Sequence, residues 1–222
     1  QVNIYNNIKK VVSRKINITV SQAFLKMLEI LISVNFKEYL LNDNNFNFFS
    51  QCEAPGNFIM AINYYLKNYT NIKNINWKAQ SLNPKKYKDA FGNDYGIIRK
   101  YKNRWLFGTD KTNGDLTNIK TIEYLQKNIN INLNFISSDC GLHCNNIDQM
   151  INQENYMTQL NISQIYSILT ILKKGGSCIF KTFIPQLLPI NISINYLLYK
   201  SFDKIFFTKP IINEGSSEYY IV

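Results

Sequence analysis

The chain has 222 residues, of which 45% are hydrophobic and 18% charged, so it is expected to be globular rather than disordered. Its 25 Lys and Arg outnumber 15 Asp and Glu, and the net charge of +10 favours a polyanionic partner. No run of about 18 apolar residues is present, which excludes a membrane span. We expect one domain over residues 1–222, excised from a longer protein.

The first 45 residues are predicted to form a leading helical segment. Val2–Lys15 is mixed and basic, and is expected to be a helix or an arm. Ser21–Leu31 has apolar residues at helical spacing, with Ser21 as N-cap. Lys26 lies within this helix. A lysine there ordinarily extends its ammonium to water, so the segment alone indicates a solvated side chain.

From residue 46 onward, strands and helices alternate. Phe46–Cys52 is predicted as an aromatic-rich strand, and the turn Ala54–Asn57 leads into the helix Phe58–Leu66. Small residues in such a turn let a ligand approach the backbone, and the first N–H groups of the helix face the ligand's polar end. A connection with no ligand is equally compatible with this turn.

A second strand, Lys73–Ala79, leads into the long irregular stretch Ser81–Arg104. Compact domains rarely keep so much irregular chain without a use for it. Here basic and aromatic residues are mixed, as on nucleic-acid surfaces, where aromatic faces stack on bases and cations meet phosphates. An ordinary solvated insertion is the alternative. The residues concerned are Lys85, Lys86, Lys88, Arg99, Lys100, Lys102 and Arg104, with Tyr87, Phe91, Tyr95 and Tyr101.

The rest of the chain continues the alternation. Further strands are predicted at Trp105–Gly108, Leu133–Ser138 and Ser177–Phe180, helices at Asn118–Asn128, Gln153–Leu172 and Ile190–Tyr199, and closing strands at Phe202–Thr208 and Glu218–Val222. Such alternation requires a mostly parallel sheet with helices on both faces. The predicted fold is therefore a doubly wound α/β domain.

In such a sheet the turns that follow the strands share one edge. The polar features expected there are Glu53–Asn57, Asp110 and Asp115, Asp139, and Lys181 at the end of the fifth strand. Acids at several strand ends suit a ligand with an amino group and ribose or base donors. Lys181 lies in the apolar stretch FKTF, where burial disfavours the ammonium and acids favour it. A lysine balanced in this way can act as a base.

The four cysteines lie in or beside predicted strands, where a free thiol behaves as a small hydrophobe. They are Cys52, Cys140, Cys144 and Cys178. This placement favours a reducing compartment. Cys140 and Cys144 flank the only histidine, His143, but the group lacks a fourth ligand, so we expect no metal site.

The order and spacing of several motifs resemble the FtsJ/RrmJ-like ribose 2′-O-methyltransferases, most closely the branch that methylates the first transcribed nucleotide of capped mRNA. The resemblance runs from about Ser21 to Val222. The motifs are SQAFLKMLEI, CEAPGNF, GDLTN, SSDCGL, the QEN-containing helix, GGSCIFKTF and KPIINEGSSEYYIV. It implies a Rossmann-like S-adenosylmethionine-dependent methyltransferase fold with a mostly parallel seven-stranded sheet. Residues 46–222 would form the core behind the leading segment 1–45.

The family's catalytic tetrad is Lys-Asp-Lys-Glu, which the resemblance matches to Lys26, Asp139, Lys181 and Glu218. By analogy, Lys181 removes the proton from a ribose 2′-hydroxyl, and the other three set its protonation and orientation. The oxygen then attacks the methyl carbon of S-adenosylmethionine in line, the carbon–sulfur bond breaks, and S-adenosylhomocysteine leaves. Holding the reacting atoms collinear supplies much of the acceleration. The resemblance overturns the solvated interpretation of Lys26 and requires no metal.

The resemblance also implies ligand-binding residues. The cofactor's methionine and ribose would lie along Glu53, Ala54, Pro55, Gly56, Asn57 and Phe58, its adenine near Asp115 and Leu116, and Asp139 close by. Candidates for RNA contact are Lys85, Lys86, Arg99, Lys100, Arg104 and Lys209.

Three departures from the family pattern leave parts of this site open. The turn has PGN where many relatives have PGG. No acid ends the second strand, so Gln80 or Ser81 makes the ribose contact or the contact is lost. The segment before Glu218 is one residue shorter than in the family pattern and lacks the arginine usual there. RNA binding by this segment is therefore in doubt. No 7-methylguanine pocket is identifiable.

The implied activity is conversion of cap 0 to cap 1 on capped mRNA, with no membrane involved. Other subunits or domains of a capping or transcription complex are further partners. The skewed composition suggests a capping protein of a large DNA virus or cytoplasmic genetic element, located in the cytoplasm, virion or viral factory, with the nucleus left open. Alternatives are the same chemistry on ribosomal or transfer RNA, or a non-catalytic RNA-binding subunit of a capping complex. An unrelated Rossmann oxidoreductase would carry G-x-G-x-x-G, which EAPGNF lacks.

Overall fold

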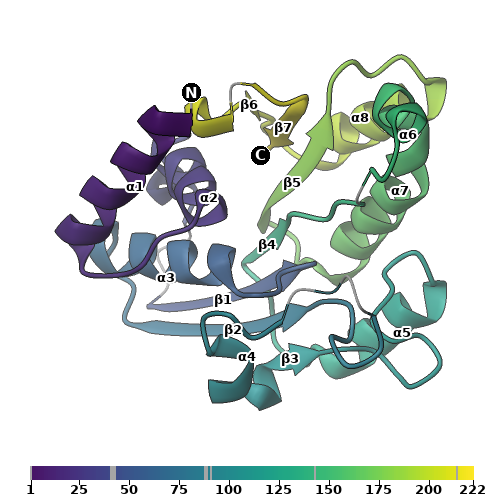
Figure 1. Cartoon of the computed structure of the whole chain (residues 1–222). Helices are drawn as coiled ribbons and strands as arrows, with labels where there is room; N and C mark the ends of the chain where they lie inside the picture. The colour runs from purple at the N-terminus through teal and green to yellow at the C-terminus, as the bar shows by residue number, and fades with distance from the viewer. Residues whose placement is uncertain (1, 41–43, 88–89, 91, 143, 214) are drawn as a thin grey trace.

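A computed structural model of the chain describes residues 2–40, 44–87, 90, 92–142, 144–213 and 215–222. Its centre is a seven-stranded sheet with the order β3-β2-β1-β4-β5-β7-β6 (Figure 1). Strand β7 is antiparallel to β5 and β6, and the other pairs are parallel. The predicted α/β class is confirmed. The strands are β1 Asn45–Gln51, β2 Asn74–Gln80, β3 Trp105–Leu106, β4 Phe135–Ser138, β5 Ser177–Phe183, β6 Phe207–Thr208 and β7 Glu218–Ile221.

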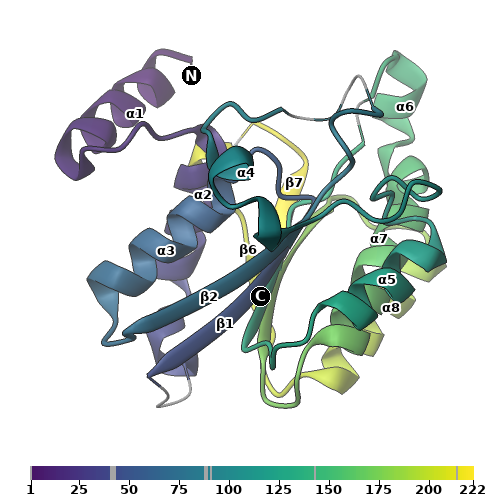
Figure 2. The same ribbon diagram turned by 90° about the horizontal axis from the view of Figure 1, so that it is seen from below.

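Helices cover both faces of the sheet (Figure 2). One face carries α1 Val2–Ile16, α2 Gln22–Ser33 and α3 Asn57–Tyr69, and the other carries α5 Ile119–Asn128, α7 Gln153–Ile171 and α8 Pro189–Ser201. The short elements are α4 Ile97–Lys100, α6 Ile147–Ile151, and the 3-10 turns η1 Phe36–Tyr39, η2 Lys102–Arg104 and η3 Ile211–Asn213.

Helix α2 belongs to the core of the domain. It begins at Ser21, whose hydroxyl accepts a hydrogen bond from Phe24 N at 3.0 Å, as predicted for an N-cap. Phe24, Met27 and Ile30 recur at helical spacing and are fully buried. They share one hydrophobic cluster with residues of α3 and of β1, so the predicted leading segment helps to build the core.

Strand β5 is longer than predicted. We expected it to end at Phe180 with Lys181 following, but β7 pairs beside it and extends it to Phe183. Lys181 lies opposite Tyr220 in this antiparallel pair. The backbone of Lys181 is therefore held within a paired strand and does not lie in a turn after it. Two other predicted strands are shorter than expected, since β3 and β6 have two residues each.

No helix in the described part of the chain is long and apolar enough to cross a membrane. His143, Lys88 and Phe91, which the sequence analysis considered for metal or RNA binding, lie outside the described residues.

Candidate active site

A cavity of about 700 Å³ lies at the carboxyl ends of the parallel strands. Its lining comes from α2, the turn after β1, the segment after β2, the loops after β3 and β4, and strands β5 and β7. The predicted site residues in the lining are Lys26, Glu53, Ala54, Pro55, Asn57, Phe58, Asp115, Leu116, Asp139, Lys181 and Glu218. Gly56 and Asp110 are not among the lining residues.

Two lysines and two acids meet in this cavity. Lys26 Nζ lies 2.7 Å from Glu218 Oε2, and Lys181 Nζ lies 3.8 Å from Glu218 Oε1. Lys181 Nζ is also 3.3 Å from Asp139 Oδ1 and donates a hydrogen bond to the Asp139 carbonyl at 3.1 Å. Lys181 thus lies between two carboxylates, one of which is shared with a second lysine.

The fold explains why these side chains converge. Lys26 lies on a face of α2 that turns toward the sheet, so only 12% of its side chain is exposed, and its isolated interpretation as solvated is wrong. Glycine at position 141 leaves room for Lys181, because a Cβ there would lie 2.9 Å from the lysine Nζ. Burial raises the pKa of Glu218, but the ammonium groups of Lys181 and Lys26 outweigh it and hold that pKa below its usual range.

Tyr220 is a further member of the site that was not predicted from the sequence. Its side chain is fully buried, and its hydroxyl donates a hydrogen bond to Asp139 Oδ1 at 3.0 Å. Burial, with the neighbouring charges of Asp139 and Glu218, raises the pKa of this phenol well above its usual value, so it remains a donor. Strand alternation in EYYIV could have indicated it, since Tyr220 is two residues beyond Glu218 and on the same face.

Glu53 caps the helix that follows the first turn. Its Oε1 accepts hydrogen bonds from Phe58 N at 2.9 Å and Ile59 N at 3.1 Å, in the first turn of α3. The carboxyl is 5% exposed. Burial, aided by the charge of Asp139, raises its pKa to about 8 despite these two backbone donors. Glu53 is therefore largely protonated at neutral pH.

We expect replacement of Glu53 by glutamine to change the pH dependence of stability. The folded carboxyl keeps its proton up to about pH 8, whereas its pKa in the unfolded chain is the ordinary 4.5. The protonated Glu53 carboxyl contributes fully to the free energy of unfolding below pH 4.5. That contribution is lost as the pH rises from 4.5 to about 8, by up to about 1.4 kcal/mol per pH unit. Urea unfolding across the window should give a shallower decline for Glu53→Gln than for the wild type. Parallel declines would contradict the assigned pKa.

Gln80, one of the two candidates for the ribose contact, is engaged by backbone groups on both sides. Its Oε1 accepts from Cys52 N at 3.0 Å, and its Nε2 donates to the Gly114 carbonyl at 2.6 Å. The amide therefore ties the turn after β1 to the loop after β3. Ser81, the other candidate, lines the cavity.

The expectation of free cysteines is wrong for two of the four. Cys52 and Cys140 form a disulfide, with their Cα atoms 5.0 Å apart, whereas Cys144 and Cys178 are free. The bond joins the residue before Glu53 to the residue after Asp139, because the parallel strands β1 and β4 are neighbours. It also uses one of the two thiols that flank position 143. Within the described residues, no group of three or more His, Cys, Asp or Glu side chains could hold a metal.

The segment from Ser81 to Arg104 borders the cavity through Leu82, Tyr87, Ala90, Asp94 and Tyr95. Four of its predicted RNA contacts, Lys85, Lys86, Arg99 and Lys100, are exposed. The Arg104 guanidinium instead lies over the Trp77 and Tyr101 rings, 5.0 and 5.8 Å from their centroids. Lys209 is exposed beyond β6 and donates to the Ser216 carbonyl at 2.6 Å.

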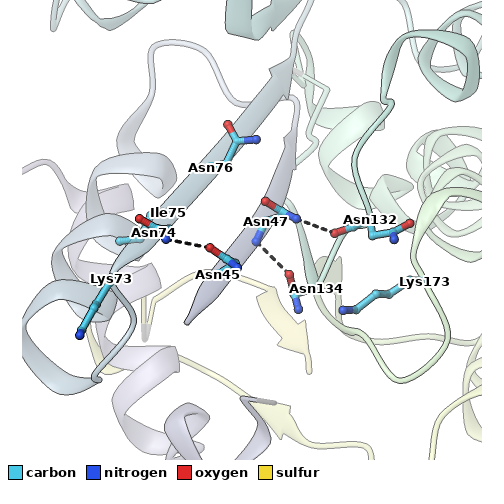
Figure 3. Close-up of a pocket in the computed structure, with 9 residues that line it drawn as sticks. All are labelled: Asn45, Asn47, Lys73, Asn74, Ile75, Asn76, Asn132, Asn134 and Lys173. Atoms are coloured by element: carbon cyan, nitrogen blue, oxygen red, sulfur yellow. Dashed lines mark hydrogen bonds between the residues drawn. The ribbon is translucent and has the colours of Figure 1, made fainter. Parts of the chain in front are cut away.

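A second hollow, of about 600 Å³, lies at the opposite edge of the sheet, where the parallel strands begin (Figure 3). Asparagine side chains dominate it, and several bind one another or the backbone. Asn74 Nδ2 donates to Asn45 Oδ1, and Asn47 Nδ2 donates to the Asn132 carbonyl. The described residues that line this hollow include two lysines but no carboxylate, whereas the cavity at the carboxyl ends brings amines and carboxylates together and is therefore the candidate active site.

The sheet order with a reversed β7, and a cavity at the carboxyl ends of its parallel strands, define a Rossmann-like methyltransferase domain. The sequence model of the FtsJ-like methyltransferase family matches residues 19–222. The chain belongs to the FtsJ-like methyltransferase family.

Three relatives show the range of similarity. "Uncharacterized protein L511" of Acanthamoeba polyphaga mimivirus is 36% identical over 225 residues, covering 100% of this chain and 28% of that protein. "Cap-specific mRNA (nucleoside-2′-O-)-methyltransferase 2" of Pongo abelii is 32% identical over 216 residues, covering 91% and 27%. "Probable methyltransferase EP424R" of an African swine fever virus isolate is 29% identical over 234 residues, covering 100% and 53%. The chain therefore spans between about a quarter and a half of these relatives.

Proposed function

We propose that this chain transfers a methyl group from S-adenosylmethionine to the ribose 2′-hydroxyl of the first transcribed nucleotide of capped mRNA. The observation that carries this proposal is the position of Lys181. Its Nζ lies inside the cavity, within 4 Å of both Asp139 and Glu218, with Lys26 on the far side of Glu218. Two amines and two carboxylates around one position suit proton removal from a sugar hydroxyl.

The cavity suits S-adenosylmethionine in size and lining. About 700 Å³ is within the range of small-molecule sites. Ala54 and Pro55 line the cavity, and the small side chain of Ala54 lets a ligand approach the backbone of the turn. Asn57 and Phe58 would flank the methionine and ribose, and Asp115 with Leu116 the adenine. When bound, this cofactor supplies an electrophilic methyl group on a sulfonium.

The four charged residues of the site would have different roles in proton removal. Lys181 would take the 2′-hydroxyl proton on Nζ. Lys26 engages one oxygen of Glu218, so part of the carboxylate's charge is neutralised and less of it faces Lys181. Asp139, held by Tyr220, orients the Lys181 amine through the 3.3 Å contact. The group that reacts is thus both oriented and screened before substrate arrives.

We propose capped mRNA, rather than ribosomal or transfer RNA, as the substrate because the cap-specific methyltransferases of Pongo abelii and Mus musculus match this chain at 32% and 30% identity. Relatives from mimivirus and African swine fever virus support a viral origin, and we propose that the protein acts in capping in the cytoplasm or viral factory. The test is transfer of labelled methyl to short capped RNA, uncapped RNA and structured ribosomal or transfer RNA, with the label mapped. Label on the first ribose of capped RNA alone is expected. Label on structured RNA alone would show that the substrate is ribosomal or transfer RNA and not capped mRNA.

The exposed cations near the cavity predict salt-sensitive RNA binding. Each phosphate contact on a single strand contributes about 0.7 to the slope of log affinity against log salt concentration. We expect the double variant Lys85→Ala/Lys86→Ala to lower the magnitude of that slope by about 1.4. Lys73→Ala/Lys173→Ala, at the opposite edge of the sheet, removes the same charge and should leave the slope near the wild-type value. Equal slopes in both double variants would exclude the first pair from the RNA surface.

A further inference from the structure

Glu218 has a neighbour outside the four charged residues. Asn213 Nδ2 donates a hydrogen bond to Glu218 Oε2 at 2.5 Å, the same oxygen that lies 2.7 Å from Lys26 Nζ. The other oxygen, Oε1, faces Lys181 at 3.8 Å. One carboxylate oxygen is therefore held by two donors, and the second is presented to the proposed base.

Asn213 reaches this position from a turn anchored on α2. The residue is 6% exposed and ends η3. Ile211 N donates to Glu29 Oε1 at 2.7 Å, and Gln22 Nε2 donates to the Ile212 carbonyl at 3.2 Å. Positions 22 and 29 are four residues before and three after Lys26, so all three share one helix face. The face of α2 that bears Lys26 therefore also binds the turn that contains Asn213.

The turn also restrains the backbone of Asn213 itself. Its N–H donates to the Pro210 carbonyl at 2.9 Å, and its carbonyl accepts from Ser216 N at 3.1 Å. These bonds fix the backbone position from which the buried side-chain amide reaches Glu218. Such a fixed, buried donor is suited to hold a partner's orientation.

We propose that Asn213 is a positioning residue for methyl transfer, fixing the Glu218 carboxylate so that Oε2 serves Lys26 and Oε1 alone faces Lys181. Without this donor the carboxylate is free to turn more of its charge toward Lys181, which favours the ammonium and removes the base. The charged or titratable groups around Glu218 are Lys26 from α2, Lys181 from β5, Asp139 after β4, and Tyr220 on β7. This inference rests on the proposed function.

The test compares Asn213→Ala and Asn213→Asp with Ile211→Ala. Loss of a hydrogen bond to a charged group predicts a kcat about 10- to 100-fold lower for Asn213→Ala, with unchanged cofactor affinity and RNA KM. Its rate–pH profile should move to higher pH. Asn213→Asp should lose more, because a carboxylate cannot donate and repels Glu218. Ile211→Ala changes an exposed side chain in the same turn and should behave as wild type.

Three results would overturn the inference. An unchanged kcat and pH profile in Asn213→Ala would do so, and so would a loss of rate matched by weaker cofactor binding. The third comes from a carbon-13 NMR titration of the Glu218 carboxyl, which needs no substrate. Its midpoint should rise in Asn213→Ala, and an unchanged midpoint would remove the proposed contact. If wild type methylates no RNA while this midpoint still rises, the proposed function fails but the contact stands.

Discussion

Lys181→Ala is expected to lower the rate of methyl transfer by about 10²–10⁴-fold, the usual contribution of a positioned acid or base. The Nζ atom lies within 4 Å of both the Asp139 and the Glu218 carboxylates, and 9% of the side chain is exposed. Cofactor binding should persist, because the turn after β1 and the Asp115–Leu116 loop are untouched. Single-turnover transfer and equilibrium cofactor binding measure the two effects separately.

Two further variants show whether Lys181 acts as a base or only as a positive charge. Lys181→Arg keeps the charge, but a guanidinium does not deprotonate in proteins, so this variant should be as slow as Lys181→Ala. Substantial activity in Lys181→Arg would make the residue an electrostatic group instead. Lys174→Ala, in the exposed turn before β5, is the matched control and should keep the wild-type rate.

Gly114→Ala is expected to cost several kcal/mol of folding stability and to disrupt the proposed adenine side of the cavity. Gly114 has φ +77°, and a Cβ there would lie 2.1 Å from the Ser81 carbonyl oxygen, a backbone atom that cannot rotate away. Relief of this clash would separate the loop after β3 from the segment after β2. It would also break the bond from Gln80 Nε2 to the Gly114 carbonyl. Urea unfolding and cofactor binding should both weaken.

Gly96→Ala provides the matched control for that prediction. Gly96 has φ +69°, but no atom of the described residues lies within 4 Å of the position that a Cβ would take there. It should therefore show only the left-handed backbone penalty of about 1–2 kcal/mol. If the two glycine variants were equally stable, close approach of the two loops would not be the cause.

The sequence predicted most of the fold because its signals are local. Helix periodicity and an N-cap at Ser21 located α2, and apolar runs located the parallel strands. The extension of β5 to Phe183 depends on pairing with β7, which local patterns do not specify. Element α6 was missed because its apolar residues are exposed, with Ile147 and Ile151 each 74% accessible. Without a buried face there is no core-facing periodicity to detect.

The candidate site was predicted less evenly. Similarity of motifs selected Lys26, although a lysine on an amphipathic helix ordinarily indicates solvent. The contacts of Gln80 could not be predicted, because its amide bonds a backbone carbonyl 34 residues away. Asn213 is only five residues before Glu218, but its contact depends on the 3-10 turn that η3 forms against α2, which no local pattern indicated. The disulfide between Cys52 and Cys140 was missed for the same reason, since adjacency of β1 and β4 brings together residues 88 positions apart.

The ion pair between Lys26 and Glu218 joins residues 192 positions apart. A ribosome adds residues in order, so β7 emerges only after every other strand. A nascent chain or one that stops before β7 would carry Lys26 without its carboxylate partner, and β5 would pair with β4 but not with β7. We therefore expect the charged site to be completed only once β7 has been synthesised, and translation products that stop before β7 to be inactive.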